Sequence, residues 1–296
     1  MRLRIGTRGS RLALAQAEEV AGLLRERGHE TETVPMTTAG DRGASPAASP
    51  TGTKGLFVAE ITDALSRGEV DLAVHSAKDL PSEDPPGVGV AAVPQRGLPY
   101  DVLVSREEEL PDQPVVGTSS LRRRAQLLRM HPTAAVRDLR GNVDTRLRKM
   151  DEGALDALVL AAAGLARLGL GPRHLRPLPV DEMVPAPGQG ALAVQALADQ
   201  EAAGAARDID HPPSRAAFET ERRVVALLGG GCRLPLGAYA ETRDGAIRLL
   251  AVVVRPDGSD LLWSQVEGEE PGQVAGEAAE TLLAAGAGSI LADLRA

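Results

Sequence analysis

The sequence predicts an α/β protein of three domains, in which two similar α/β domains are followed by a small α+β domain. Two observations support this fold class. Strand-like and helix-like segments alternate over most of the chain, which is typical of α/β sheets. A second stretch then repeats the order of the first. The length of 296 residues also exceeds the roughly 100–200 residues of one domain.

The first domain is predicted to run strand, helix, strand, loop, helix and strand, over residues 2–7, 11–28, 30–36, 39–55, 56–68 and 69–76. In its first helix, Ala13, Ala17, Val20 and Leu24 recur at helical spacing. Gly28 is a plausible stop for that helix. Residues 39–55 are rich in Gly, Ser, Pro and Thr and indicate a mobile loop. We therefore expect parallel strands joined by helices.

The second unit repeats this plan. Residues 114–130 are strand, Gly-Thr turn and helix, and residues 141–161 are helix, glycine and apolar strand. Pro94–Pro99 and Met183–Ala191 are expected to be two crossings between the units. The expected domains are 1–94 with 188–208, 98–184, and 211–296.

The third domain has a different order. An amphipathic helix at 214–228 precedes the glycine–cysteine segment, and three consecutive strands and a closing helix follow it. These elements are expected over 235–241, 246–255, 261–267 and 272–286. Consecutive strands flanked by helices indicate an α+β domain.

Composition excludes several classes of protein. A net charge of −8 and 2% aromatic residues argue against a nucleic-acid binder. The longest apolar run, residues 157–166, is far shorter than the roughly 20 residues that span a bilayer. One cysteine rules out an internal disulfide, and no secretory signal is visible, so we expect a cytoplasmic protein. None of the five histidines pairs with another at metal-ligand spacing, so no metal site is predicted.

Arginines cluster at one predicted helix N-terminus. Thr118, Ser119 and Ser120 precede Arg122 and Arg123, whose charges oppose the helix dipole unless an anion binds there. The cluster also includes Arg124, Arg137, Arg140, Arg146 and Arg148. The matching turn of the first domain contains Arg8 and Ser10. Because guanidinium groups bind carboxylates and phosphates in bidentate fashion, the set favours a ligand with several anionic groups. The alternative is a solvated basic face.

The stretch "VHSAKDLP" ends a predicted buried strand. Ligands of open α/β sheets bind beyond the carboxyl ends of strands, where Ser76, Lys78 and Asp79 stand. Asp79 could hold a cation or donate a proton, and Ser76 and Lys78 could bind an anion. The alternative is an N-cap aspartate beside a surface lysine. His75 is expected to be structural.

The only cysteine, Cys232, follows Gly229, Gly230 and Gly231 directly. Three glycines give it no side-chain shielding, and Arg233 would favour the nucleophilic thiolate. A single exposed thiol can form a covalent bond to a ligand. The alternative is a buried cysteine that acts as a small hydrophobic residue.

Eight motifs, in order, resemble those of the hydroxymethylbilane synthase (porphobilinogen deaminase) family. They are "RIGTRGSRLALAQA", "GTKGLFVAEI", "DLAVHSAKDLP", "GTSSLRRRAQL", "DLRGNVDTRL", "LAAAGLARLGL", "PAPGQGALA" and "GGGCRLPLGAYA". The resemblance extends from about residue 4 to residue 240. Two features depart from the family pattern: the loop sequence of residues 44–53, and Arg233, where a neutral polar residue is expected.

The resemblance implies an enzyme that joins four porphobilinogen molecules head to tail, releases ammonia and hydrolyses off hydroxymethylbilane. The chain would grow on a dipyrromethane cofactor held by a thioether at Cys232, and Asp79 would be the main catalytic carboxylate. The other implied cofactor-binding residues are Ser76, Lys78, Thr118, Ser120, Arg122, Arg123, Arg140 and Arg146. The implied substrate-binding residues are Arg8, Ser10, Arg140, Arg146, Arg167, Lys54, Phe57 and Gln189. A monomer is the family expectation.

Two alternatives stay open on the sequence alone. Two α/β domains with two crossings also resemble periplasmic solute-binding proteins, so the chain could be a non-enzymatic binding module for a polyanionic ligand. The arginines could also serve a regulator that binds phosphate or nucleic acid. The binding module would need neither Cys232 nor Asp79. The acidic balance and the scarcity of aromatics count against the regulator.

Overall fold

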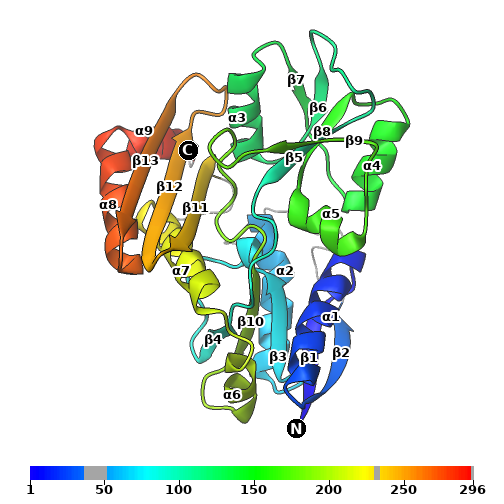
Figure 1. Cartoon of the computed structure of the whole chain (residues 1–296), viewed down its shortest axis with the longest axis vertical. Coiled ribbons are helices and arrows are strands. Elements are labelled where there is room, and N and C mark those ends of the chain that lie inside the picture. Colours follow the sequence, from blue (N-terminus) through cyan, green and yellow to red (C-terminus); the bar gives the residue numbers. More distant parts are fainter. Residues whose placement is uncertain (37–51, 230–233, 295–296) are drawn as a thin grey trace.

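The computed structural model describes residues 1–36, 52–229 and 234–294, with the side chains of residues 52–57 left out. Three sheets organise this part of the chain. In Figure 1 the first sheet lies at the bottom, the second at the top and the third on the left.

The first sheet has the strand order β2-β1-β3-β10-β4. Its strands are β1 (Arg2–Arg8), β2 (Glu30–Met36), β3 (Leu72–Ser76), β4 (Val88–Ala92) and β10 (Leu192–Leu197). β1 pairs in parallel with both β2 and β3, whereas β10 is antiparallel to β3 and β4. The helices of this unit are α1 (Arg11–Glu26), α2 (Gly52–Ser66) and α6 (Glu201–Arg207).

Alternating side chains bury both faces of this sheet. On one face Leu72 and Val74 pack with α1 and α6. On the other face Ala73 packs with Ile61 and Leu65 of α2. Because successive side chains of a strand point to opposite faces, β3 is apolar on both, which is typical of a central strand.

The second sheet repeats the first in outline, with the order β7-β6-β8-β5-β9. Its strands are β5 (Asp101–Ser105), β6 (Val115–Gly117), β7 (Ala135–Arg137), β8 (Ala157–Ala161) and β9 (His174–Leu178). Its helices are α3 (Leu121–Met130), α4 (Val143–Asp151) and α5 (Ala162–Leu168). α4 and α5 cover one face and α3 the other.

The chain passes between these two sheets twice. It leaves the first sheet after β4 and enters the second at β5, and it returns between β9 and β10. Strands that enter a sheet from a crossing run against their neighbours, so both sheets are mixed. The expected parallel strands joined by helices are present, but β10 and β5 are antiparallel to their neighbours, because they are reached by crossings and not by helix connections within the sheet.

The third sheet is antiparallel and has the order β11-β12-β13. Its strands are β11 (Leu236–Arg243), β12 (Ala246–Val254) and β13 (Leu261–Gly268), and its helices are α7 (Pro212–Leu227), α8 (Pro271–Ala284) and α9 (Ala287–Asp293). One face packs on the helices. The other face places Val252 and Val254 against Ala125 of α3 and Val184.

The predicted fold class is confirmed by these three sheets and their helices. The domain bounds 1–94 with 188–208, 98–184 and 211–296 stay a prediction. Within the segment expected to be a loop, residues 52–55 belong to α2, because that helix begins at Gly52. The remainder of that segment up to residue 51 lies outside the described residues.

Candidate active site

The predicted site residues follow the carboxyl ends of parallel strands in both sheets. Arg8 ends β1, Ser76 ends β3, and Thr118 follows β6. Ser10 and Ser120 are the N-caps of α1 and α3, and each side-chain oxygen accepts a hydrogen bond from a backbone N–H of its helix. Each hydroxyl group therefore stabilises the start of the helix that follows one of these strands.

Arg122 and Arg123 are buried and share one carboxylate, that of Asp101. Arg122 Nη2 lies 2.7 Å from Asp101 Oδ2, and Arg123 Nη2 lies 2.8 Å from Asp101 Oδ1. The same guanidinium groups donate to the carbonyl oxygens of Val184 and Val159. Asp101 has no exposed surface. The first turn of α3 thus points inward and not into solvent.

Electrostatics at this cluster favour an additional anion. Burial alone would raise the pKa of Asp101, but the charges of Arg122 and Arg123 hold that pKa well below its usual range. Burial, and after it the charge of Arg123, lowers the pKa of Arg146, so these two cations repel each other. Three guanidinium groups and one carboxylate leave a net charge of +2.

An unpaired buried donor supports the same conclusion. Arg122 Nε is buried and has no hydrogen-bond partner among the residues that the structure describes. A buried donor without an acceptor costs free energy comparable to a lost hydrogen bond. The arginines present therefore fit a bound group that carries carboxylates.

The return crossing brings the predicted residues together at positions 188–190. Gln189 Nε2 donates to Asp101 Oδ1 at 2.9 Å, and Arg167 Nη2 donates to the carbonyl of Gly190 at 3.1 Å. A Cβ at Gly188 would lie 2.9 Å from the backbone of Ala77 and Lys78. Three consecutive residues thus contact Asp101, which is the shared partner of the arginine pair, Arg167, and the turn that carries Asp79.

Asp79 ends a short 3₁₀ turn, Ala77–Asp79, directly after β3. Ala77 and Leu80 on either side belong to an apolar cluster with Val58 of α2 and Phe218 of α7. Ser76 precedes this turn and Lys78 lies within it, and both are half-buried. The backbone of the turn is therefore held in place by packing against α2 and α7.

His75 lies under the same turn. Burial lowers its pKa to about 4, against the opposing attraction of Asp79. Its imidazole is therefore neutral near pH 7. This agrees with the structural role expected from the sequence.

The other predicted arginines differ in their surroundings. Arg167 forms an ion pair with Glu19 of α1 at 2.7 Å, which ties α5 to the first unit. Arg146 is half-buried and donates to the carbonyl of Gly141, whereas Arg140 is exposed. Arg8 is half-buried.

Three predicted site residues have no described side chain. Cys232 and its neighbour Arg233 lie in the gap at residues 230–233. Lys54 and Phe57 lie on the first turns of α2, but their side chains are not described. Their predicted roles stay predictions.

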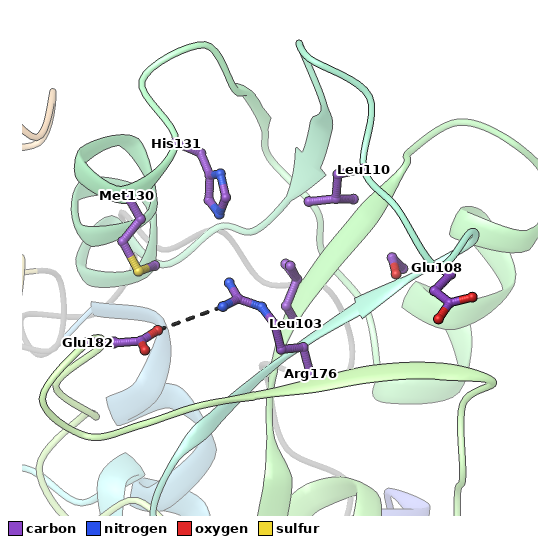
Figure 2. A pocket seen from close by; sticks show the side chains of 8 residues that line it. Leu103, Glu108, Leu110, Met130, His131, Arg176 and Glu182 are labelled. Carbon is purple, nitrogen blue, oxygen red and sulfur yellow. Dashed lines mark ion pairs between the residues drawn. The ribbon is translucent and has the colours of Figure 1, made fainter.

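A pocket of about 580 Å³ lies elsewhere on the second unit. Figure 2 shows Leu103, Leu110 and Met130 around it, with Arg176 directed toward Glu182 at 3.8 Å. None of the predicted site residues lines it. The buried arginine cluster and the Asp79 turn, and not this pocket, define the candidate site.

Two family models match the chain. "Porphobilinogen deaminase, dipyromethane cofactor binding domain" covers residues 3–205, and "Porphobilinogen deaminase, C-terminal domain" covers residues 216–284. The chain belongs to the porphobilinogen deaminase family. Its activity is that of a porphobilinogen deaminase, or hydroxymethylbilane synthase, a transferase of tetrapyrrole biosynthesis that uses a dipyrromethane cofactor. The resemblance inferred from the eight motifs is confirmed.

Relatives match over almost the whole chain. The porphobilinogen deaminase of Desulforudis audaxviator is 49% identical over 99% of this chain and 97% of its own length. That of Thermus thermophilus is 45% identical over 98% of both. Among solved structures, a probable amino-acid ABC transporter extracellular-binding protein of Bacillus subtilis is 10% identical, with a TM-score of 0.43 over 71% of this chain and 88% of that one. That likeness is too weak to carry an argument.

Membership of the porphobilinogen deaminase family favours the enzyme over the binding module. Among the residues that the structure describes, no helix is long and apolar enough to cross a bilayer. Nor do three or more His, Cys, Asp or Glu side chains gather as a metal site in that part of the chain.

Sequence reasoning missed the carboxylates that organise this deaminase site. Asp101, Glu221 and Asp84 are far from the arginines in sequence, and each contacts at least one arginine side chain in the structure. One signal could have pointed to Asp101: it opens a buried apolar strand, where an unpaired charge is unfavourable.

Proposed function

We propose that this porphobilinogen deaminase holds its dipyrromethane cofactor through Cys232 and condenses porphobilinogen beside Asp79. The observation that carries the proposal concerns residues 188–190. Gly188 lies against the Asp79 turn, and Gln189 donates to Asp101, the carboxylate that Arg122 and Arg123 share. A catalytic carboxylate and a set of cations are thereby joined through one short segment.

The arginines suit the charge of the substrate. Each porphobilinogen carries an acetate and a propionate, so a growing chain accumulates carboxylates. Arg122 and Arg123 supply buried positive charge, and Arg146 supplies a half-buried one. Arg8 ends β1, Arg140 follows β7, and Arg167 lies in the last turn of α5. Ion pairs that exclude water give such guanidinium groups their strongest binding. The cofactor, when bound, supplies the pyrrole end from which the chain grows.

Asp79 is proposed to stabilise positive charge on the reacting porphobilinogen. The aminomethyl group reacts in its protonated form, CH₂–NH₃⁺. Its carbon–nitrogen bond breaks, ammonia leaves with the electron pair, and the positive charge passes to the methylene carbon and is shared with the pyrrole N–H. A fixed carboxylate that accepts a hydrogen bond from that N–H lowers the free energy of the charged state. The packed turn Ala77–Asp79 provides the fixed position.

Ser76, Lys78, Thr118 and Ser120 are proposed to add hydrogen bonds to carboxylates at the strand ends. Lys54, Phe57, Ser10 and Gln189 are proposed to contact the substrate. The monomeric state and the cytoplasmic location expected from the sequence stay predictions.

The variant Asp79→Asn tests this assignment. We expect it to fold and to carry on the peptide with Cys232 an adduct of two deaminated porphobilinogen units, which no reductant removes. Turnover should fall by roughly 10²–10³, because the amide lacks the charge that opposes the developing cation. Intact mass, peptide mapping and steady-state rates measure the three quantities.

Glu83→Gln is the matched control, since Glu83 is an exposed carboxylate four residues further along the chain. It should keep full activity. Wild-type turnover by Asp79→Asn would remove Asp79 from catalysis, and an adduct on any residue other than Cys232 would overturn the attachment.

A further inference from the structure

Helix α7 of the third unit braces the turn that carries Asp79. Its residue Phe218 is buried in one cluster with Ala77 and Leu80, on the two sides of the turn. One helical turn further on, Arg222 lies over the Phe218 ring, 5.8 Å from the ring centre. The same face of α7 thus offers the turn an apolar contact and a cation.

Arg222 holds the chain just beyond Asp79 at two points. Its Nε donates to the carbonyl oxygen of Pro81 at 3.0 Å, and its Nη1 lies 2.8 Å from Asp84 Oδ2. The side chains of Arg222 and Asp84 are only 18% and 20% exposed. Because water is largely excluded, this pair restrains the segment more than a surface ion pair would.

Asp84 extends the restraint into the first unit. Its other oxygen, Oδ1, accepts a hydrogen bond of 2.8 Å from Gln195 Nε2 on β10. Gln195 Oε1 in turn accepts one of 3.2 Å from Thr62 of α2. A continuous series of hydrogen bonds therefore links α7, the segment after Asp79, strand β10 of the first sheet and helix α2.

We infer that Arg222 is a positioning residue for Asp79. It touches no reacting group, but it fixes the backbone two residues beyond Asp79 against the helix that leads to the cysteine segment. The inference rests on the catalytic role proposed for Asp79. A misplacement of about 1 Å in a catalytic group can cost on the order of 10²-fold in rate, so loss of this restraint should be visible in turnover.

The test compares Arg222→Met with Arg223→Met in the holoenzyme. Methionine keeps an apolar stem over Phe218 and removes the guanidinium, whereas Arg223 is the exposed neighbour on the same helix. We expect Arg222→Met to retain the thioether adduct and its KM, and to lose about 10- to 100-fold in kcat. Arg223→Met should match the wild type.

Amide hydrogen exchange gives a readout that general loss of stability would not produce. Exchange should quicken in residues 77–84 of Arg222→Met, while the core strands β11 and β12 keep their protection. Arg222→Lys should rescue kcat in part, because an ammonium can reach Asp84 but cannot form the forked contact.

Asp84→Asn serves as a second variant if Arg222→Met fails to fold. It should lower kcat in the same direction. Where Arg222→Met does fold, combining the two substitutions should add little, since both remove one interaction. Wild-type kcat in these variants would overturn the positioning role. Amide exchange of residues 77–84 at the wild-type rate in Arg222→Met would overturn it as well. If Asp79→Asn is inactive in that case, the proposed function stands and only the positioning fails.

Discussion

A buried imidazole makes the stability of this deaminase sensitive to pH. His75 is 6% exposed, its Nε2 has no hydrogen-bond partner among the described residues, and burial lowers its pKa from 6.5 to about 4. In the unfolded chain the imidazole binds a proton below about pH 6.5, whereas in the folded chain it does so only below about pH 4. Folding is therefore opposed progressively as the pH falls through this window.

We expect the free energy of unfolding to fall by about 2–3 kcal/mol between pH 7 and pH 4.5 through His75 alone. His75→Asn does not titrate there, so its unfolding free energy should lack this component, although the variant is less stable at pH 7. Urea unfolding at several pH values measures the difference.

His174→Asn on β9 is the control and should keep the wild-type dependence on pH. Parallel pH profiles for His75→Asn and the wild type would show that His75 is not the titrating group.

At the scale of single residues, the sequence predicted the arginines of the candidate site but not the carboxylate that forms ion pairs with them. Arg122 and Arg123 were predicted from their place at a helix N-terminus. Their partner Asp101 lies 21 and 22 positions away in the sequence. It contacts them only because α3 packs on the sheet that contains β5. Such pairs depend on tertiary packing, which local patterns do not encode.

At the scale of the elements, the return crossing packs directly against the Asp79 turn. Gly188 has a φ of +74°, and a Cβ there would lie 2.9 Å from Ala77 C and Lys78 N. Gly188→Ala should therefore move the turn as well as strain the crossing. We expect a loss of about 2–4 kcal/mol in unfolding free energy together with reduced turnover.

Gly169→Ala provides the matched comparison. Gly169 also has a positive φ, +63°, at the end of α5, but a Cβ there would meet no atom within 4 Å. It should lose about 1 kcal/mol through backbone strain alone and keep full turnover. Equal effects of the two substitutions, by chemical denaturation and by rate, would mean that contact with the turn is unimportant.

Elements with clear periodicity were predicted well, and those set by tertiary context were not. α1 and β2 follow their predicted ranges to within two residues. The direction of β10 could not be read from its residues, because a strand's pattern is the same in parallel and antiparallel pairing. The start of α2 at Gly52 was missed because glycine and threonine favour loops.

On the scale of the whole molecule, the three units meet at one buried carboxylate. Glu221 of α7 has no exposed surface. Its oxygens lie 2.6 Å from Arg96 Nη1 in the first crossing, 2.6 Å from the N–H nitrogen of Gly188 in the return crossing, and 2.7 Å from that of Ala240 in β11. The sequence predicted both crossings, but it did not predict that the Glu221 carboxylate connects them to the third unit.

Glu221→Gln should therefore weaken the contacts between the third unit and the other two units. The amide keeps one oxygen acceptor, but its NH₂ group must face at least one donor, and Arg96 loses its counter-charge in the interior. Breaking a buried pair in this way costs about 3–5 kcal/mol, so we expect that loss in unfolding free energy. Because the loss falls on the contact between units, calorimetry should show the third unit melting ahead of the other two.

Glu219→Gln separates this effect from a general effect of charge on α7. Glu219 lies two residues earlier, is 49% exposed and pairs with Arg215 at 3.3 Å. An exposed pair of this kind contributes about 0–1 kcal/mol, so the variant should melt in one transition close to the wild type. If Glu221→Gln also melts in one transition with no greater loss, the units are held together by their apolar contacts, such as Val252 and Val254 against Ala125, and not by the buried carboxylate.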